Sequence, residues 1–166
     1  MKHSQAAIML LLVLNLATTA WFGLQTNDAP APQQQPVATR TISVQLPQQV
    51  TKDYRDNLLK GFMTYFNKKD YDAMYQMLGP AARSQIPAET ARSEFQKLST
   101  YFDQVKSGQY ARAELTQRQG DTSVYVLHYD VNFSDKSQAP KGSLKINLAT
   151  NATGEAQVYG IRLNSL

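Results

Sequence analysis

The pattern of apolar and polar residues divides the chain into three parts, and the first part is the most apolar. Residues 1–25 contain a block, 6–24, in which only three of 19 side chains are polar. A helix needs about 20 predominantly apolar residues to cross the hydrocarbon core of a membrane. The block therefore predicts a single transmembrane anchor or a signal peptide. Trp21 and Phe22 favour the anchor, whereas the small residues 18–20 favour cleavage. Both interpretations place the remaining chain outside the cytoplasm.

The second part is a linker, and the third has the length of one domain. Residues 26–50 are rich in proline and glutamine and contain few large apolar side chains. Proline favours extended backbone, and glutamine offers little surface to bury, so this segment is expected to act as a semi-stiff spacer. Residues 51–166 are numerous enough to form a single compact domain with its own core.

The first half of this domain has the spacing of amphipathic helices. Apolar residues recur every three or four positions over 53–67, which predicts the first helix. A shorter helix is predicted over 71–78, followed by a single turn at Pro80. Proline suits the first turn of a helix, so a third helix is predicted to begin at Pro87 and to extend to about Val105. Three helices are therefore expected before the sheet.

The second half alternates apolar and polar residues, which is typical of strands. Turn residues separate four such runs, and they predict strands over 109–118, 122–133, 142–149 and 155–163. Helices followed by an antiparallel meander make an α+β fold. We expect three N-terminal helices packed on a curved, cone-like sheet of four antiparallel strands.

Three local sequences are similar to the nuclear transport factor 2-like and ketosteroid isomerase-like superfamily. A long helix, a polar break, a short helix and a proline-bounded turn are represented by FMTYFNKKDYDAMYQMLGPAARSQIP, residues 62–87. The family's long central strand is represented by SVYVLHYDVNFS, residues 123–134. Its closing strand is represented by EAQVYGIRL, residues 155–163. The resemblance implies a cone-shaped space between sheet and helices that either hosts small-molecule chemistry or is simply packed. Function must therefore be argued from the residues of the site.

Candidate chemistry is concentrated on the central strand. His128 and Asp130 are two residues apart and point to the same side of the strand, which is the spacing of a general base steadied by a carboxylate. Tyr54, Tyr65 and Tyr125 are candidates to donate hydrogen bonds to a ligand or to a developing enolate oxygen. These five residues are the candidate catalytic and ligand-binding residues.

The alternative is that His128 and Asp130 lie on the solvated face of the sheet. The opposite face of the same strand carries Tyr125, Phe133 and the apolar residues between them. Exposing this aromatic face costs more than exposing the polar one, so we expect the aromatic face to be buried.

Composition excludes several kinds of site. The chain contains no cysteine, so disulfides, thiolate metal sites and thiol nucleophiles are excluded. The net charge of +4 is small, and the basic residues are scattered, so nucleic-acid binding is not expected. No pattern of metal ligands or of a phosphate-binding loop is present in the sequence, and we expect neither a metal nor a cofactor.

The leader, the spacer and the compact domain together predict an exported protein in the periplasm or another extracytoplasmic space, anchored in the bacterial inner membrane by residues 6–24 if these are not cleaved. We expect a non-catalytic binding or scaffold domain. Its expected partner is another envelope protein or a second copy of the chain in a homodimer. The alternative is a small periplasmic isomerase-like or ligand-binding protein that uses the cone-shaped space.

Overall fold

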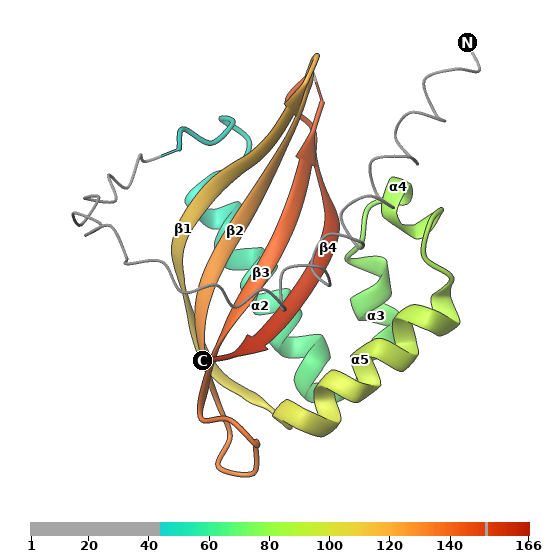
Figure 1. The fold of residues 1–166 in the computed structure, drawn as a ribbon, viewed down its shortest axis with the longest axis vertical. Coiled ribbons are helices and arrows are strands. Elements are labelled where there is room, and N and C mark those ends of the chain that lie inside the picture. The colour runs from blue at the N-terminus through green and yellow to red at the C-terminus, as the bar shows by residue number, and fades with distance from the viewer. Residues whose placement is uncertain (1–43, 152) are drawn as a thin grey trace, which may run out of the picture. The chain divides into compact units, whose positions relative to one another are not determined.

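The computed structural model describes residues 44–151 and 153–166 (Figure 1). The predicted anchor or signal peptide, residues 6–24, and most of the predicted linker lie outside the described residues. Within the described part, no helix is both long enough and apolar enough to cross a membrane.

Within the residues from 44 onward that the structure describes, four helices precede the sheet. They are α2 (Lys52–Lys68), α3 (Tyr71–Gln76), α4 (Pro80–Arg83) and α5 (Ala88–Phe102). Side-chain caps fix where α2 and α3 begin. The Thr51 hydroxyl accepts a hydrogen bond from the Tyr54 amide, and the Asp70 carboxylate accepts one from the Ala73 amide. Helix α2 ends at Lys69, whose left-handed φ of 56° turns the chain toward α3. The single turn expected at Pro80 is the short helix α4.

Four antiparallel strands follow the helices and form one open sheet. They are β1 (Val105–Gln119), β2 (Thr122–Phe133), β3 (Lys141–Thr150) and β4 (Ala156–Ser165). Each strand pairs with the next, so β1 and β4 are the two edges. The predicted α+β class and the antiparallel four-stranded sheet are thus confirmed.

The boundary between the last helix and the first strand differs from the prediction. We expected the helix to continue to about Val105, but it ends at Phe102, and Val105 is already the first residue of β1. The side chain of Asn67 holds Val105 in the extended form, since its oxygen accepts from the Val105 amide at 2.8 Å and its nitrogen donates to the Val105 carbonyl at 2.9 Å. Val105 is buried, so it satisfies the helical spacing without being helical.

The core lies between the helices and one face of the sheet, and large side chains fill it. Figure 1 shows α2 running across this face. The rings of Phe62 and Phe66 stack with centroids 5.3 Å apart, and those of Phe102 and Phe133 stack at 4.5 Å. The side chains that are essentially inaccessible come from both layers: Phe62, Phe66, Met74, Leu127, Tyr129, Leu144, Ile146 and Leu148.

The packed part of the chain begins slightly before α2. Val50 is buried, and Leu46 packs against the core although it belongs to the proline-rich segment. The Val50 amide donates to the Pro47 carbonyl at 2.9 Å, which turns the chain into the N-cap at Thr51. The last residues of the predicted linker are therefore part of the folded domain.

Candidate functional site

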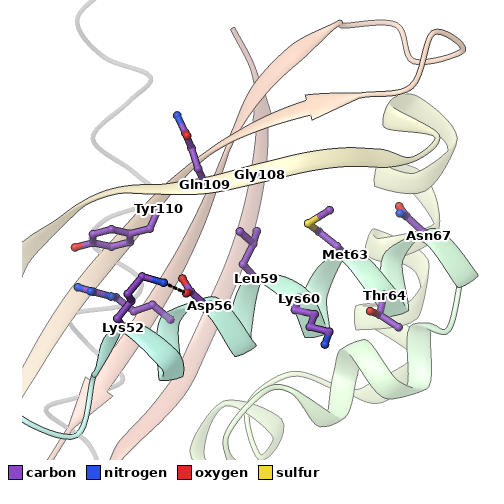
Figure 2. A pocket seen from close by; sticks show the side chains of 11 residues that line it. Lys52, Asp56, Leu59, Lys60, Met63, Thr64, Asn67, Gly108, Gln109 and Tyr110 are labelled. Atoms are coloured by element: carbon purple, nitrogen blue, oxygen red, sulfur yellow. Dashed lines mark hydrogen bonds and ion pairs between the residues drawn. The ribbon is translucent and has the colours of Figure 1, made fainter.

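An open groove of about 740 Å³ lies between helix α2 and the edge strand β1. Figure 2 shows the side chains of Leu59 and Met63 projecting from α2 toward β1, where they form an apolar floor. Polar and charged side chains surround this floor. The remaining lining residues are Lys52, Arg55, Asp56, Lys60, Thr64 and Asn67 of α2, and Gly108, Gln109 and Tyr110 of β1.

Gly108 and Asn67 hold the helix close to the strand. A Cβ atom at position 108 would lie 3.1 Å from a methyl group of Leu59 and 3.2 Å from one of Val131. A larger residue would therefore require the side chains of Leu59 and Val131 to shift by a few tenths of an ångström. Asn67 pairs with the backbone of Val105 at the other end of the groove. These two contacts set the width of the groove.

One end of the groove is built from an arginine and two tyrosines. The Arg55 guanidinium carbon lies 4.2 Å from the centroid of the Tyr110 ring, a cation–π contact. The Tyr110 ring meets the Tyr129 ring edge to face at 5.8 Å, and the Tyr129 hydroxyl donates to the Arg55 carbonyl at 3.1 Å. Burial raises the pKa of the Tyr129 hydroxyl, so this hydroxyl stays protonated and remains a donor.

The groove carries a positive charge. Three cations, Lys52, Arg55 and Lys60, line it against a single carboxylate, that of Asp56. Lys52 and Asp56 form an ion pair, and the hydrogen bond that Lys52 donates to the Asp56 carboxylate is the main cause that raises the pKa of Lys52. The Arg55 Nε atom is buried and has no hydrogen-bond partner among the described residues. Two positive charges are therefore left without a carboxylate in the groove.

The strand side of the groove is an open sheet edge. In the described part of the chain, the only strand that pairs with β1 is β2. On an edge strand, half of the backbone N–H and C=O groups point away from the sheet and can pair with another chain. β1 has 15 residues, and the groove runs along it at Gly108, Gln109 and Tyr110. This geometry can accept an extended peptide as an additional strand.

His128 and Asp130 lie on the face of the sheet opposite to the helices. The expectation that the aromatic side of β2 is buried is confirmed, because Tyr125 and Phe133 are both in the interior. Asp130 is exposed, whereas His128 is only 7% exposed. The carboxylate that contacts the imidazole is that of Glu114 on β1, whose Oε2 lies 3.3 Å from Nε2. Their alignment is too poor for a hydrogen bond.

The three candidate tyrosines lie in separate environments. Tyr54 is half-buried on α2, its hydroxyl lies 3.5 Å from the Ala156 carbonyl, and burial raises its pKa. Tyr65 is half-buried on α2 and packs against the core, whereas Tyr125 is buried on the inner face of β2. The structure therefore does not bring Tyr125 together with His128, since the two point to opposite faces. A role of these residues in ligand binding stays a prediction.

The groove was not among the sites predicted from the sequence. Arg55 and Tyr110 are 55 positions apart, and neither belongs to a motif. Among the described residues, no group of three histidine, aspartate or glutamate side chains could hold a metal ion. In comparisons with known proteins, no family model and no curated protein matches this chain.

Proposed function

We propose that this domain is a non-catalytic binding module of the bacterial envelope, and that it binds an extended segment of a partner protein in the groove between α2 and β1. The observation that carries the proposal is the open edge of β1 beside an apolar floor and a basic rim. Backbone pairing supplies affinity in this mode of recognition, and the pockets beside the strand supply specificity.

The apolar block at residues 6–24 and the proline-rich spacer support an envelope location. A spacer between membrane and domain would leave both the groove and the sheet accessible to partners. Helices followed by a four-stranded meander support the likeness to the nuclear transport factor 2-like superfamily, and we place the domain there as part of the same proposal.

The enzyme alternative has less support from the structure. A general base must reach the same substrate as the groups that stabilise the developing charge. His128 lies on the outer face, while Tyr125 lies on the inner face, where Leu127 and Tyr129 fill the space next to it. Binding along the open edge needs no such convergence of side chains.

The proposal is tested with the full chain in lipid nanodiscs and a displayed library of random peptides. We expect selected peptides to alternate apolar and polar residues and to contain carboxylates, because the groove has an apolar floor and a positive charge. Met63→Glu in the floor is expected to weaken binding by about tenfold or more, which corresponds to about 1.4 kcal/mol. The matched control is Gln96→Glu, an exposed change on α5 that adds the same charge and is expected to bind as the parent does.

Hydrogen exchange locates the bound peptide. We expect slower exchange of the outward amides of β1 when a selected peptide is present, because a pairing strand covers them. Slower exchange confined to β4, the other edge, would contradict the proposal. Equal weakening of peptide binding by Met63→Glu and Gln96→Glu would also contradict it.

A further inference from the structure

The outer face of the sheet carries a row of basic side chains, one from each strand. Arg112 of β1 is the register partner of His128 of β2, His128 is the partner of Lys145 of β3, and Lys145 is the partner of Arg162 of β4. We call these four residues the basic row. Neighbouring strands are about 4.8 Å apart, so the basic row is about 14 Å long.

Stability does not explain the basic row. Like charges directly opposite one another on a sheet are destabilising, and Lys145 and Arg162 are such a pair. Arg112, Lys145 and Arg162 make no ion pair and no side-chain hydrogen bond within the described residues, so no direct partner neutralises their charges there. The side chain of His128 is only 9% exposed, and its Nε2 atom contacts the Glu114 carboxylate at 3.3 Å without a well-aligned hydrogen bond. A buried polar atom without a well-aligned hydrogen bond is costly, and a carboxylate of another molecule would supply a better one.

Carboxylates lie on both sides of the basic row. Two residues along β1 from Arg112 is Glu114, whose register partner is Val126. Two residues along β2 from His128, in the other direction, is Asp130. The positive charge is therefore confined to one line. A flat anionic membrane would place phosphates over these carboxylates as well as over the cations, whereas a narrow acidic segment would not.

We propose that the basic row binds an acidic segment of a partner protein, whose carboxylates lie in a line across the outer face of the sheet. The spacing supports this occupant. Alternate side chains of an extended peptide are about 6.8 Å apart, so three alternate carboxylates span about 14 Å, the length of the basic row. This surface is on the opposite side of the sheet from the helices, and the inference does not depend on the groove between α2 and β1.

His128 makes the basic row sensitive to pH. Burial lowers the pKa of the imidazole, Arg112 and Lys145 lower it further, and Glu114 opposes them. These groups and Asp130 are the described charged groups that face it. The imidazole is therefore neutral near neutral pH, and protonation at lower pH adds a fourth positive charge. A bound carboxylate favours that proton, so the acidic segment is expected to bind more tightly as the pH falls.

The test uses the full chain in nanodiscs of zwitterionic lipid and a fluorescent peptide in which glutamate and serine alternate. Binding is followed by fluorescence anisotropy at low salt. Arg112→Gln, Lys145→Gln and Arg162→Gln are each expected to weaken binding about 2- to 5-fold, and the triple variant by roughly tenfold or more. Binding by the parent chain is expected to tighten between about pH 7.5 and about pH 5.5, and His128→Gln is expected to remove this dependence.

The matched control removes three positive charges elsewhere. Lys68→Gln, Lys97→Gln and Lys136→Gln are exposed changes outside the sheet, and together they are expected to weaken binding less than twofold. If this control weakens binding as much as the triple variant does, the effect is one of net charge and the proposal is wrong. It is also wrong if the triple variant still binds the peptide normally but no longer binds vesicles of phosphatidylglycerol, because the basic row would then be a membrane contact.

Discussion

Replacing Phe62 by alanine tests whether side chains fill the space between helices and sheet, which distinguishes the proposed groove-binding domain from the alternative that takes a small ligand in this space. The Phe62 ring is fully inaccessible, and it stacks on Phe66 with centroids 5.3 Å apart. Full burial of such a side chain contributes about 1.5 to 3 kcal/mol, and a stacked aromatic pair adds about 0.5 to 1.5 kcal/mol. The better helix propensity of alanine offsets about 0.5 kcal/mol of this loss of stability. A loss of about 3 kcal/mol in the free energy of unfolding is expected, near the lower end of measured Phe→Ala changes in cores.

The free energy of unfolding is measured by urea denaturation of the full chain in nanodiscs, followed by circular dichroism. Tyr101→Ala is the matched control, because this tyrosine is on α5 and is 38% exposed. Its loss is expected to cost no more than about 1 kcal/mol. The Phe62→Ala variant should also bind a small apolar probe such as benzene, since an apolar cavity in a rigid core stays dry.

Two results would refute this reasoning. A loss below about 1 kcal/mol for Phe62→Ala would mean that the ring borders empty space instead of packed atoms. Binding of benzene by the unchanged chain would mean that an apolar cavity already exists. Either result would favour the alternative in which the inner space takes a small ligand.

Three further predictions concern single side chains. Gly142→Ala is expected to cost about 1 to 3 kcal/mol or more, measured by urea denaturation, because its Cβ would overlap a backbone carbonyl of β4; normal stability would contradict the strand pairing. Tyr129→Phe is expected to cost about 1 kcal/mol by removing the hydrogen bond to Arg55, and to remove one tyrosine that ionises only when the chain unfolds in alkali. Stability is expected to fall as the pH is lowered through about 6.5, because the unfolded chain then binds a proton that His128, with its lowered pKa, does not. His128→Gln should remove this part of the pH dependence, and an unchanged profile would show that another group causes it.

Element types could be predicted because local signals and tertiary packing agree. The apolar stripe of the first helix, the cap at Asp70 and the alternation in β2 all correspond to elements of the structure. The prediction was wrong at Val105 because burial is required there in a helix and in a strand alike. Asn67 determines that Val105 is extended, because its side chain hydrogen-bonds both backbone groups of Val105. Asn67 is 38 positions earlier in the chain. Local periodicity contains no trace of such a contact.

The groove could not be predicted for a related reason. It exists only because α2 and β1 come together, and their closest approach depends on Gly108 facing Leu59, 49 positions away. Arg55 has the pattern of an ordinary helix-surface residue, and its contact with the Tyr110 ring appears only in the folded chain.

The basic row depends on a still smaller detail, a bulge in β1. Tyr110 pairs with Tyr129, but the next register pair is Arg112 with His128, so Ala111 is an extra residue with no partner. If β1 paired without the bulge, Ala111 would lie opposite His128, and Arg112 would be the partner of Leu127, which faces the core. Because side chains alternate between faces, the bulge moves the arginine from the inner face to the outer face. Strict alternation along 109–118 would place Arg112 on the inner face, among apolar residues. The bulge avoids burying this charge, and the same displacement places it in line with His128, Lys145 and Arg162.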